Sequence, residues 1–531
     1  MPDGRLGRGI MADTQTINLT IEGQPVNVPA GTSILEAARL AGVLVPHYCY
    51  HPGLSIAGNC RMCLVEVEKS PKLVPSCATA AADGQVVHVF SDRTLEQRKG
   101  VLEFLLLNHP LDCPICDKSG ECELQDYTYR EGRAQGRSLD PKRFNPAEDF
   151  GGDVLYVTNR CILCTRCVRF MSEVAQDTAL NVSERGDRAV VGKADDKDLT
   201  HPWAANVIDL CPVGALLSKD FLHKVRAWEL DRAPSICPNC TQGCNTIVET
   251  RDNAVVRMRP RTNMDVNHYY LCDQGRLDYR WMNRTDRLEA PLVRRDDRLV
   301  AADWDEAIGL AALHLNGRRA FVLASPKLSN ESLWMLSRLM QHTGGAGGFR
   351  VAHGPEAPLP GVPDLARRTE LAANVTGAEL MGFRKSDTPL DAMQDNDVLI
   401  VADHDLTPGD VEAMQRASAV IVIGTVLPDA ARHAIVALPA TNVVEEEGTF
   451  TNLRNRVQRY QQARAGAGMS RPVWWSAGDL LAFLGEQGGY LLASQAFADL
   501  AAKRPEFAGM SYDSLGYHGQ SMAQAVAGAA R

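Results

Sequence analysis

The chain has 531 residues, a formal net charge of −9 and hydrophobic residues at 45% of its positions. A chain of this length has room for about three or four domains, and its apolar content is ordinary for a globular protein with packed cores. No run of 18 consecutive apolar residues occurs, so the sequence offers no candidate membrane-spanning helix. Lys and Arg form no dense block, and nucleic acid is therefore not an expected partner.

The N-terminal segment does not have the form of a secretory signal, because Arg5 and Arg8 are not followed by an apolar stretch. We expect residues 1–10 to be a flexible extension and Met11 to be the biological start.

The first predicted elements form a small sheet with one helix. Alternating residues predict strands over 16–21 and 25–28, and a helix follows Ser33. Two further strands are predicted over 63–68 and 85–90. A small sheet with one helix and a cysteine-rich loop at its rim is the arrangement of a ferredoxin-like β-grasp domain.

Fifteen cysteines are the most informative feature of the sequence. Their number is odd and no export signal precedes them, so metal ligation is favoured over disulfides. They divide into four local sets with none left over, whereas a random scatter would leave strays. The sets are Cys49, Cys60, Cys63 and Cys77; Cys113, Cys116 and Cys122; Cys161, Cys164, Cys167 and Cys211; Cys237, Cys240, Cys244 and Cys272.

The first set has the spacing C-x10-C-x2-C-x13-C, from Cys49 to Cys77. One loop supplies three thiolates and a later segment supplies the fourth, as in plant-type ferredoxins, where the first gap is shorter. Gly58 beside Cys60 lets the backbone approach a bound cluster closely. An iron–sulfur cluster fits this pattern, and a structural zinc ion held by four thiolates is the alternative.

The second set, Cys113, Cys116 and Cys122, leaves one ligand position open. His109 precedes it with the spacing H-x3-C-x2-C-x5-C, after a helix-like run over 101–107. The histidine can be the fourth ligand or a capping or surface residue, and the spacing does not decide between these roles. A zinc site of three cysteines and one histidine is also compatible with the pattern.

The third set begins with C-x2-C-x2-C, from Cys161 to Cys167, and continues at Cys211-Pro212. Each thiolate of such a run can reach a different iron of a cube-shaped cluster, whereas structural zinc prefers two separated C-x2-C pairs. Two-cluster bacterial ferredoxins place a further cysteine shortly after the run, and this chain does not, so Cys211 is the expected fourth ligand.

The fourth set combines the run C-x2-C-x3-C, from Cys237 to Cys244, with a distant Cys272. Pro238 and Gly243 mark the run as a non-helical loop. Three thiolates from one tight loop and one from a later segment again predict an iron–sulfur cluster.

These motifs resemble those of a known family, the large iron–sulfur subunit of NADH:quinone oxidoreductase, respiratory complex I. The resemblance implies that His109 is a ligand, that the first set holds a [2Fe–2S] cluster and that the second and third sets hold [4Fe–4S] clusters. The segments that carry it are His47-Tyr48-Cys49, Gly58-Asn59-Cys60-Arg61-Met62-Cys63, His109-Pro110-Leu111-Asp112-Cys113-Pro114-Ile115-Cys116 and Cys161-Ile162-Leu163-Cys164-Thr165-Arg166-Cys167.

The resemblance also implies a function. Single electrons would pass from a flavin-bearing, NADH-oxidising subunit through the first, third and second sets, in that order, to a quinone-side iron–sulfur subunit. The chain itself would contain no catalytic residue. The expected location is the peripheral arm on the cytoplasmic side of a bacterial inner membrane, with membrane contact only through partner subunits.

The fourth set resembles the [4Fe–4S] domain of molybdopterin oxidoreductases such as formate dehydrogenases. The residues that follow resemble a shortened pterin domain, most clearly at Glu446-Glu447-Gly448-Thr449-Phe450-Thr451-Asn452. Gln274 stands where those enzymes carry a lysine, and no spare cysteine is available to bind molybdenum. We therefore expect a [4Fe–4S] cluster at the fourth set and no molybdopterin.

The C-terminal part has the pattern of an α/β domain. Buried parallel strands are predicted over 398–402 and 420–423, and a helix is predicted over 305–314. The acidic runs at 195–198 and 445–447 are expected to be solvated surface.

The expected fold class is α+β and multidomain, with an N-terminal ferredoxin-like β-grasp, cluster-binding loop and helix domains, and a C-terminal α/β domain resembling a truncated molybdopterin oxidoreductase. The expected domains are residues 1–10 (flexible extension), 11–95 ([2Fe–2S]), 96–150 ([4Fe–4S] with one histidine and three cysteines), 151–230 ([4Fe–4S] with four cysteines), 231–290 (molybdopterin-oxidoreductase-type [4Fe–4S]) and 291–531 (reduced molybdopterin-like α/β).

Two other functions stay open. One is the wiring subunit of a NAD-reducing hydrogenase or a formate dehydrogenase. A hydrogenase would add further cysteines, and a formate dehydrogenase would add an intact pterin domain. The other is an interaction protein that holds zinc.

Overall fold

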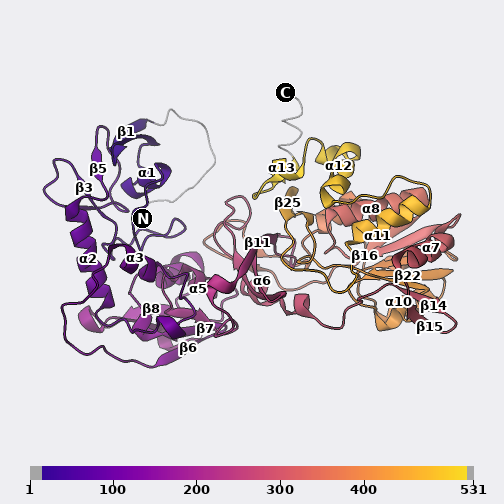
Figure 1. Ribbon diagram of the computed structural model, residues 1–531, viewed down its shortest axis with the longest axis horizontal. Coiled ribbons are helices and arrows are strands. Elements are labelled where there is room, and N and C mark those ends of the chain that lie inside the picture. Colours follow the sequence, from indigo (N-terminus) through magenta and orange to yellow (C-terminus); the bar gives the residue numbers. More distant parts are fainter. Residues whose placement is uncertain (1–14, 523–531) are drawn as a thin grey trace. The chain divides into compact units, whose positions relative to one another are not determined.

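The computed structural model describes residues 15–522, so the predicted extension over 1–10 and the predicted start at Met11 lie outside the described residues. The chain forms two compact units, divided between Trp228 and Glu229. Both units contain helices and sheets (Figure 1). Among residues 15–522, no helix combines the length and the apolar character needed to cross a membrane.

The N-terminal part of the first unit is a five-stranded sheet in the order β2-β1-β5-β3-β4 with one helix. The predicted strands over 16–21 and 25–28 are confirmed as β1 and β2, which pair antiparallel on either side of the Glu22-Gly23 turn. Ser33 caps the helix by accepting a hydrogen bond from the Glu36 amide. The elements are β1 Thr16–Ile21, β2 Gln24–Pro29, α1 Ile34–Leu40, β3 Leu64–Val67, β4 Val74–Pro75 and β5 Val86–His88.

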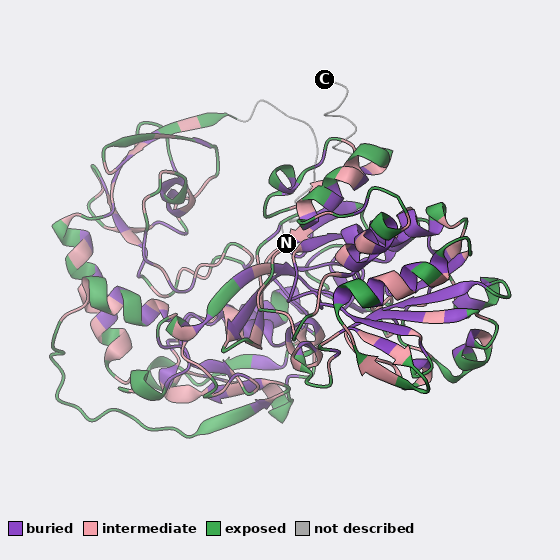
Figure 2. Cartoon of the chain, turned by 45° about the vertical axis from the view of Figure 1, so that its right-hand side comes forward, coloured by how far each residue is buried: buried purple, intermediate pink, exposed green. Residues whose placement is uncertain are grey.

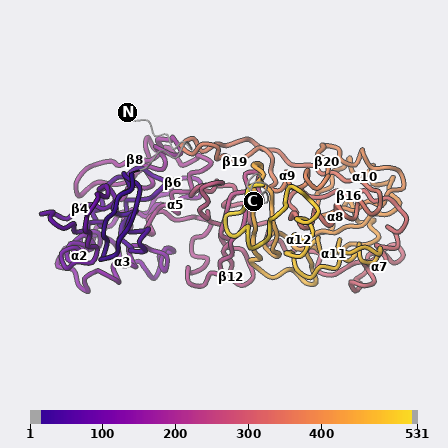
Figure 3. The backbone as a smooth tube through the Cα atoms, turned by 90° about the horizontal axis from the view of Figure 1, so that it is seen from above, coloured from indigo at the N-terminus to yellow at the C-terminus, as the bar shows by residue number. Residues whose placement is uncertain are grey.

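The rest of the first unit consists of short helices and two small sheets. One sheet has the order β10-β7-β6, and β8 pairs with β9. The helices α2 and α3 lie against each other (Figure 3). The elements are α2 Asp92–Leu106, α3 Glu123–Glu131, β6 Ala147–Gly151, β7 Val154–Val157, α4 Arg166–Arg169, β8 Leu180–Ser183, β9 Val190–Lys193, α5 Asn206–Leu210 and β10 Leu216–Ser218. Single turns of 3₁₀ or π helix are η1 Cys113–Ile115, η2 Thr158–Arg160, η3 Phe170–Val174, η4 Gly186–Arg188 and η5 Ala194–Asp196, and a further turn, η6 Ala227–Glu229, includes the point of division between the units.

Arg98 joins these parts of the first unit. Its side chain is completely buried in α2, donates to the Val89 carbonyl at 2.8 Å and forms an ion pair with Glu131 of α3 at 3.3 Å. A buried arginine is stable only when its charge is paired and its donors are bonded, so this contact fastens α2 to both neighbours.

The second unit begins with an antiparallel sheet in the order β11-β12-β13 and continues into an eight-stranded sheet. The first elements are β11 Asp231–Ile236, β12 Asn245–Arg251, β13 Ala254–Pro260, α6 Asp273–Leu277 and η7 Arg280–Asn283. The large sheet contains β14 Leu292–Arg295, β15 Arg298–Ala301, β16 Ala320–Ala324, β17 Ala346–Phe349, β20 Arg384–Lys385, β21 Val398–Ala402, β22 Ala419–Gly424 and β23 Val436–Pro439.

Six strands of the large sheet are parallel and lie in the order β23-β22-β21-β16-β17-β20. Along the chain they follow one another from β16 to β23, so the order reverses between β16 and β21. This is the strand order of the Rossmann doubly wound fold, with its switch point between those two strands. The predicted strands over 398–402 and 420–423 are confirmed as β21 and β22.

Helices cover both faces of the large sheet. Val322, Ile400 and Ile421 pack with α8 and α11 on one face. Phe321 and Leu399 point to the other face, which α10 covers (Figure 1). Because side chains alternate along a strand, a strand with apolar residues at every position is buried on both faces, as Figure 2 shows for this sheet.

The remaining elements complete the second unit. The helices are α7 Trp304–Leu315, α8 Asn330–His342, α9 Val375–Leu380, η8 Pro389–Ala392, α10 Pro408–Met414, η9 Asp429–Ala431, α11 Val473–Phe483, α12 Ala493–Lys503, η10 Pro505–Phe507 and α13 Tyr512–Leu515. The strands are the pair β18 Ala357–Pro358 and β19 Ala366–Arg367, and the sheet of β24 Gly448–Thr451, β25 Arg456–Tyr460 and β26 Gln520–Ser521.

The expectation that residues 445–447 are solvated surface is wrong. Glu445 and Glu446 are 3% and 7% exposed. The Glu445 carboxylate pairs with Arg287 at 2.7 Å and Arg464 at 2.9 Å. Local sequence shows the charge of such a run but not its partners, which come from distant parts of the chain. The run at 195–198 is exposed, as predicted.

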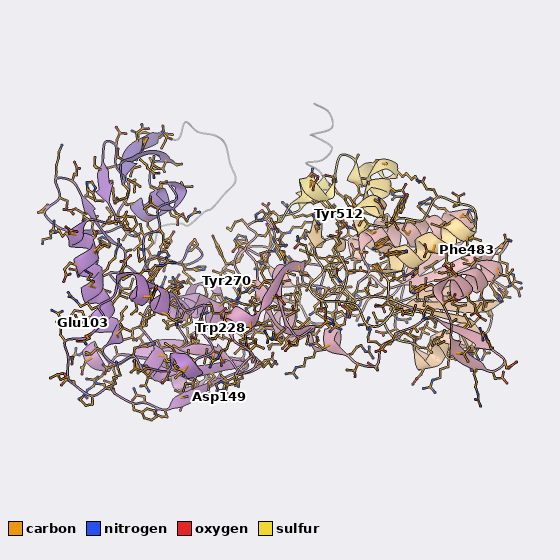
Figure 4. All side chains as sticks on the ribbon, viewed as in Figure 1. Glu103, Asp149, Trp228, Tyr270, Phe483 and Tyr512 are labelled. Atoms are coloured by element: carbon orange, nitrogen blue, oxygen red, sulfur yellow. The ribbon has the colours of Figure 1, made fainter. Side chains whose placement is uncertain are left out.

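Two buried carboxyl groups make the stability of the second unit depend on pH. Glu446 accepts hydrogen bonds from Thr441 and Tyr460, and Glu331 accepts one from Tyr512 of α13 (Figure 4). Burial raises the pKa of Glu446 to about 8 and that of Glu331 to about 7, above the ordinary value of 4.5. Between these pH values and pH 4.5 the folded state holds protons that the unfolded state has released, so the free energy of unfolding falls as the pH rises.

We expect Glu446→Gln to flatten this pH dependence. The neutral amide removes the cost of ionising a buried carboxyl, so the variant should be more stable than the wild type above pH 8, by an amount on the order of a few kcal/mol. Thermal unfolding at a fixed heating rate between pH 5.5 and 8.5 measures the effect. Glu412→Gln, at an exposed position of α10, is the control. Parallel pH profiles for Glu446→Gln and the wild type would contradict the assignment.

Candidate metal-cluster sites

The four cysteines of the first set come together at the rim of the five-stranded sheet. Cys49 and Cys60 lie in the loop between α1 and β3, Cys63 directly precedes β3, and Cys77 follows β4. The Cys49 amide lies 3.5 Å from the Cys60 sulfur, and the sulfurs of Cys63 and Cys77 are 3.3 Å apart. The Cys49 side chain also contacts Cys77. The sequence-predicted ligands therefore form one continuous group of thiols.

The second set lies between α2 and α3. His109, Cys113 and Cys122 line one cavity of about 560 Å³, together with Glu103 of α2, which is labelled in Figure 4. Cys116 lies close enough to Cys113 for their charges to interact. The structure therefore brings the histidine to the cysteines that follow it in sequence.

The environment of His109 fits a metal ligand. Its Nδ1 atom is buried and has no hydrogen-bond partner within residues 15–522. Burial lowers the pKa of His109 to about 4, and the positive charges of Lys142 and Arg160 act in the same direction. The imidazole is therefore neutral at pH 7, which is the form that binds a metal.

The third set surrounds one small cavity. Leu163 and Thr165 lie between its first three cysteines in the left-handed region, at φ +52° and +58°. Such a conformation costs a residue with a side chain roughly 1–2 kcal/mol, and strain of this kind gathers at functional sites. The walls are shared with Tyr156 and contain all four predicted ligands: Cys161, Cys164, Cys167 and Cys211.

The fourth set is buried in the second unit. The backbone amide of Cys237 donates to the Cys244 carbonyl at 2.8 Å and closes the loop. Cys272 caps α6, and its sulfur accepts a hydrogen bond from the Gly275 amide at 3.3 Å. A Cβ atom at Gly275 would lie 3.2 Å from the Cys237 sulfur and 3.3 Å from the Cys272 sulfur. The missing side chain leaves this space free for a bound group.

The buried thiols need a cation to ionise. Burial raises the pKa of Cys122 to about 11 and those of Cys164 and Cys272 to about 12. A cysteine that binds metal does so as a thiolate, and bound iron would supply the positive charge that water no longer provides. Within residues 15–522, no group of three or more Cys, His, Asp or Glu side chains is arranged so that it could hold a single metal ion.

Two arginines of α4 connect the first and third sets. Arg169 is 9% exposed and donates to the Cys49 carbonyl at 2.5 Å and to the Cys164 carbonyl at 3.3 Å. Arg166 donates to the Tyr50 carbonyl at 2.7 Å. Each arginine thus holds the cysteine loop of the first set against the third.

A third contact between the same two sets comes from the loops themselves. The side-chain amide of Asn59, beside Cys60, donates to the carbonyl of Leu163, which lies between Cys161 and Cys164, at 3.2 Å. The first and third sets are therefore neighbours within the first unit.

The third and second sets are also neighbours. The Pro212 carbonyl accepts a hydrogen bond from the Glu123 amide at 3.1 Å, which joins the residues directly after Cys211 and Cys122. Arg160 pairs with Asp112 at 2.9 Å, beside the first cysteines of the two sets.

Substituting Gly214, which follows Cys211 of the third set by three residues, tests the contact between the third and second sets. A Cβ atom there would lie 2.2 Å from the Cys116 sulfur, a separation that forces Cys116 to move. We expect Gly214→Ala to lower iron at the second set while the other sets stay loaded. Iron and sulfide analysis with EPR of the reduced protein measures this. Gly192→Ala, where no atom lies within 4 Å of the new Cβ, is the control. Full iron content in both variants would contradict the expectation.

Sequence reasoning missed the bridging arginines. Arg166 and Arg169 stand in or beside the third cysteine run, and Arg160 directly precedes it. All three are less than 10% exposed. Three arginines around one buried cysteine run are a usable signal, but only the tertiary structure shows their partners, which are carbonyls and carboxylates of other segments.

A further cavity of about 300 Å³ lies in the second unit at the carboxyl ends of the parallel strands. Ser325, Asp403 and Thr425, which follow β16, β21 and β22, line it, together with Asn239 and Gln274 near the fourth set. Ligands of doubly wound folds bind at this edge of the sheet.

Five family models match the chain, in consecutive segments. They are described as a 2Fe-2S iron-sulfur cluster binding domain (residues 14–91), an NADH-ubiquinone oxidoreductase-G iron-sulfur binding region (98–137), an NADH-quinone oxidoreductase subunit 3 ferredoxin-like domain (151–217), a molybdopterin oxidoreductase Fe4S4 domain (230–284) and molybdopterin oxidoreductase (287–408 and 396–482). The predicted multidomain α+β fold class is confirmed, and the chain contains 2Fe–2S and 4Fe–4S binding domains.

Similar proteins include a subunit of the NADH-quinone oxidoreductase of Rickettsia bellii, 40% identical over 62% of this chain and 48% of that protein. The mitochondrial 78 kDa subunit of NADH-ubiquinone oxidoreductase of Candida albicans is 45% identical over 56% of this chain and 41% of that protein. Iron-sulfur protein 1 of Solanum tuberosum NADH dehydrogenase is 43% identical over 65% of this chain and 47% of that protein. The matches thus span about half the length of these relatives.

Among solved structures, a chain of the NAD+-reducing [NiFe]-hydrogenase in its H2-reduced state is 32% identical, with a TM-score of 0.36. The match covers 39% of this chain and 90% of that one.

Proposed function

Because this chain is a homologue of the large iron–sulfur subunit of NADH-quinone oxidoreductase, we propose that it is an electron-transfer subunit of such a complex. Its proposed partners are a flavin-bearing, NADH-oxidising subunit and the quinone-side iron–sulfur subunits. The proposed place is the peripheral arm on the cytoplasmic side of a bacterial inner membrane. Its contact with the membrane would run through partner subunits.

The proposed ligands are those of the four sets. The first set would hold a [2Fe–2S] cluster and the other three would hold [4Fe–4S] clusters, with His109 completing the second. The neutral, unpartnered imidazole of His109, the shared cavity of the third set and the space beside Gly275 support this assignment. When bound, such clusters accept and release single electrons at potentials set by ligand type, hydrogen bonds to sulfur and burial.

The hydrogen bonds that link neighbouring sets are the main support for the proposal. Arg169 and Asn59 join the first set to the third, and the Pro212–Glu123 hydrogen bond joins the third to the second. This spatial order of first, third and second is the order implied by the family resemblance. The chain's own residues act by holding the three ligand sets in fixed neighbouring positions.

The buried arginines have a second effect. Arg166 and Arg169 place positive charge between two sets that would carry negative clusters. Their donors are bonded to loop carbonyls, so the side chains are held in place, and Arg166 also pairs with the Glu123 carboxylate at 3.6 Å, which partly balances its charge. Fixed cations of this kind stabilise buried negative charge without reorganising.

Anaerobic analysis of iron, sulfide, zinc and molybdenum in the purified full-length chain tests the proposal. The assignment predicts about 14 iron and about 14 sulfide per chain at full occupancy, from the composition of the cluster types. It also predicts little zinc and no molybdenum. Zinc in place of iron would support the interaction-protein alternative and reject electron transfer. Stoichiometric molybdenum would contradict the prediction of an inactive C-terminal part.

A further inference from the structure

A segment of the second unit that lies outside the large sheet covers the fourth set. Between β17 and α9 the chain leaves the large sheet and forms the strand pair β18 and β19, with Ala357 opposite Arg367. The segment then reaches the cysteine loop, where the Thr241 amide donates to the Glu370 carbonyl at 3.1 Å. Two consecutive arginines, Arg367 and Arg368, are thereby placed at the set.

Arg368 binds the loop through both its backbone and its side chain. Its Nε donates to the Gln242 side chain at 3.0 Å, and its backbone amide donates to the Cys240 sulfur. Its charge is largely balanced, because Nη1 pairs with the Glu356 carboxylate at 2.9 Å. Arg368 therefore orients the loop and donates to sulfur, and it brings to Cys240 and Cys244 a positive charge that Glu356 partly offsets.

Arg367 differs because its charge is not balanced. Its Nη1 donates to the Gln274 side-chain oxygen at 3.0 Å, and its Nη2 donates to the Pro355 carbonyl at 2.9 Å. Both acceptors are neutral, and no carboxylate within residues 15–522 pairs with this guanidinium. Gln274 lies in α6, shortly after Cys272, and holds the arginine beside the set.

Hydrogen bonds place Arg367 beside two of the four cysteines. Gln274, which holds it, comes two residues after Cys272, and its neighbour Arg368 is bound to Gln242, two residues after Cys240. All four cysteines of the set are less than 10% exposed and Arg367 is half-buried, so water screens this charge only in part.

We propose that Arg367, held in place by Gln274, sets the reduction potential of the fourth cluster and makes that cluster easier to reduce. The inference rests on the proposed [4Fe–4S] cluster at this set. A reduced cluster carries one more negative charge than an oxidised one, so a fixed, unpaired cation stabilises the reduced form more. Gln274 thus has a role of its own where molybdopterin oxidoreductases carry a lysine.

Three substitutions separate charge from structure. Arg367→Gln removes the charge, Arg367→Lys keeps it, and Gln274→Glu adds a carboxylate of the same shape that pairs with Arg367. Arg384→Gln, at an exposed position of β20, is the matched control. The readout is an EPR-monitored redox titration of the full-length, iron-loaded chain. The signal of the fourth cluster is identified by its loss in Cys272→Ala.

We expect a more negative midpoint potential in Arg367→Gln and Gln274→Glu, and potentials close to wild type in Arg367→Lys and Arg384→Gln. If Arg367→Gln loses iron, the potential of Gln274→Glu decides the role of Arg367, because this variant preserves the side-chain volume at position 274 and the contact with Arg367. An unchanged potential in Gln274→Glu with a full iron content would overturn the role of Arg367 and leave the proposed function intact. A wild-type chain without a signal that depends on Cys272 would overturn both the inference and the fourth cluster.

Discussion

Replacing Cys211 by alanine is expected to abolish electron transfer through the chain. Cys211 is the proposed distant ligand of the third set, and the third set contacts both the first and the second. Removing its cluster would interrupt the proposed path at its middle. Iron should fall by about four per chain, the content of one [4Fe–4S] cluster, and NADH-dependent quinone reduction by the assembled complex should fall to background.

The matched control is Cys272→Ala, which removes the corresponding distant ligand of the fourth set in the second unit. The same loss of about four iron is expected there, with quinone reduction largely retained. The pair of variants separates loss of a cluster from loss of the path. Retained quinone reduction in Cys211→Ala, with its iron lost, would show that electrons do not pass through the third set.

Exchanging His109 for cysteine is expected to keep the second cluster and lower its potential. A thiolate brings a negative charge where the neutral imidazole brings none, and added negative charge makes reduction less favourable. The change should be on the order of 100 mV towards negative values, given how far histidine ligands raise the potentials of Rieske centres. An EPR-monitored redox titration of the full-length chain measures it.

His109→Ala is the companion variant, and it should lose iron from the second set. Among the described residues, the cavity is lined by no histidine or cysteine other than the proposed ligands, so no side chain can replace His109. If both variants kept the iron content and potential of the wild type, His109 would be a bystander. That result would also leave the spacing H-x3-C-x2-C-x5-C without functional meaning at its first position.

The cysteine sets show how far local spacing reaches. The runs Cys60–Cys63, Cys161–Cys167 and Cys237–Cys244 each lie within one loop, so their spacing alone predicts that their thiols converge. The distant members Cys77, Cys211 and Cys272 were assigned by counting, and the structure brings each to its expected run. Their role as iron ligands stays a prediction that metal analysis tests.

The regular elements were predictable for a related reason. The strands at β1, β2, β21 and β22 and the helix α7 follow from local patterns of apolar residues. Residues 445–447 show the opposite case. Their local charge predicted exposure, but Arg287, Tyr460 and Arg464 pair with them inside the second unit.

From the sequence one can read the chemistry of this protein: which residues can bind metal, how they group, and which family they resemble. These properties depend on residue type and short-range spacing. Only the tertiary structure decided that the first set adjoins the third, that the third adjoins the second, and that Gln274 holds Arg367 near the fourth. Those relations depend on contacts between residues far apart in the chain, such as Asn59 with Leu163 and Gln274 with Arg367, and folding alone creates them.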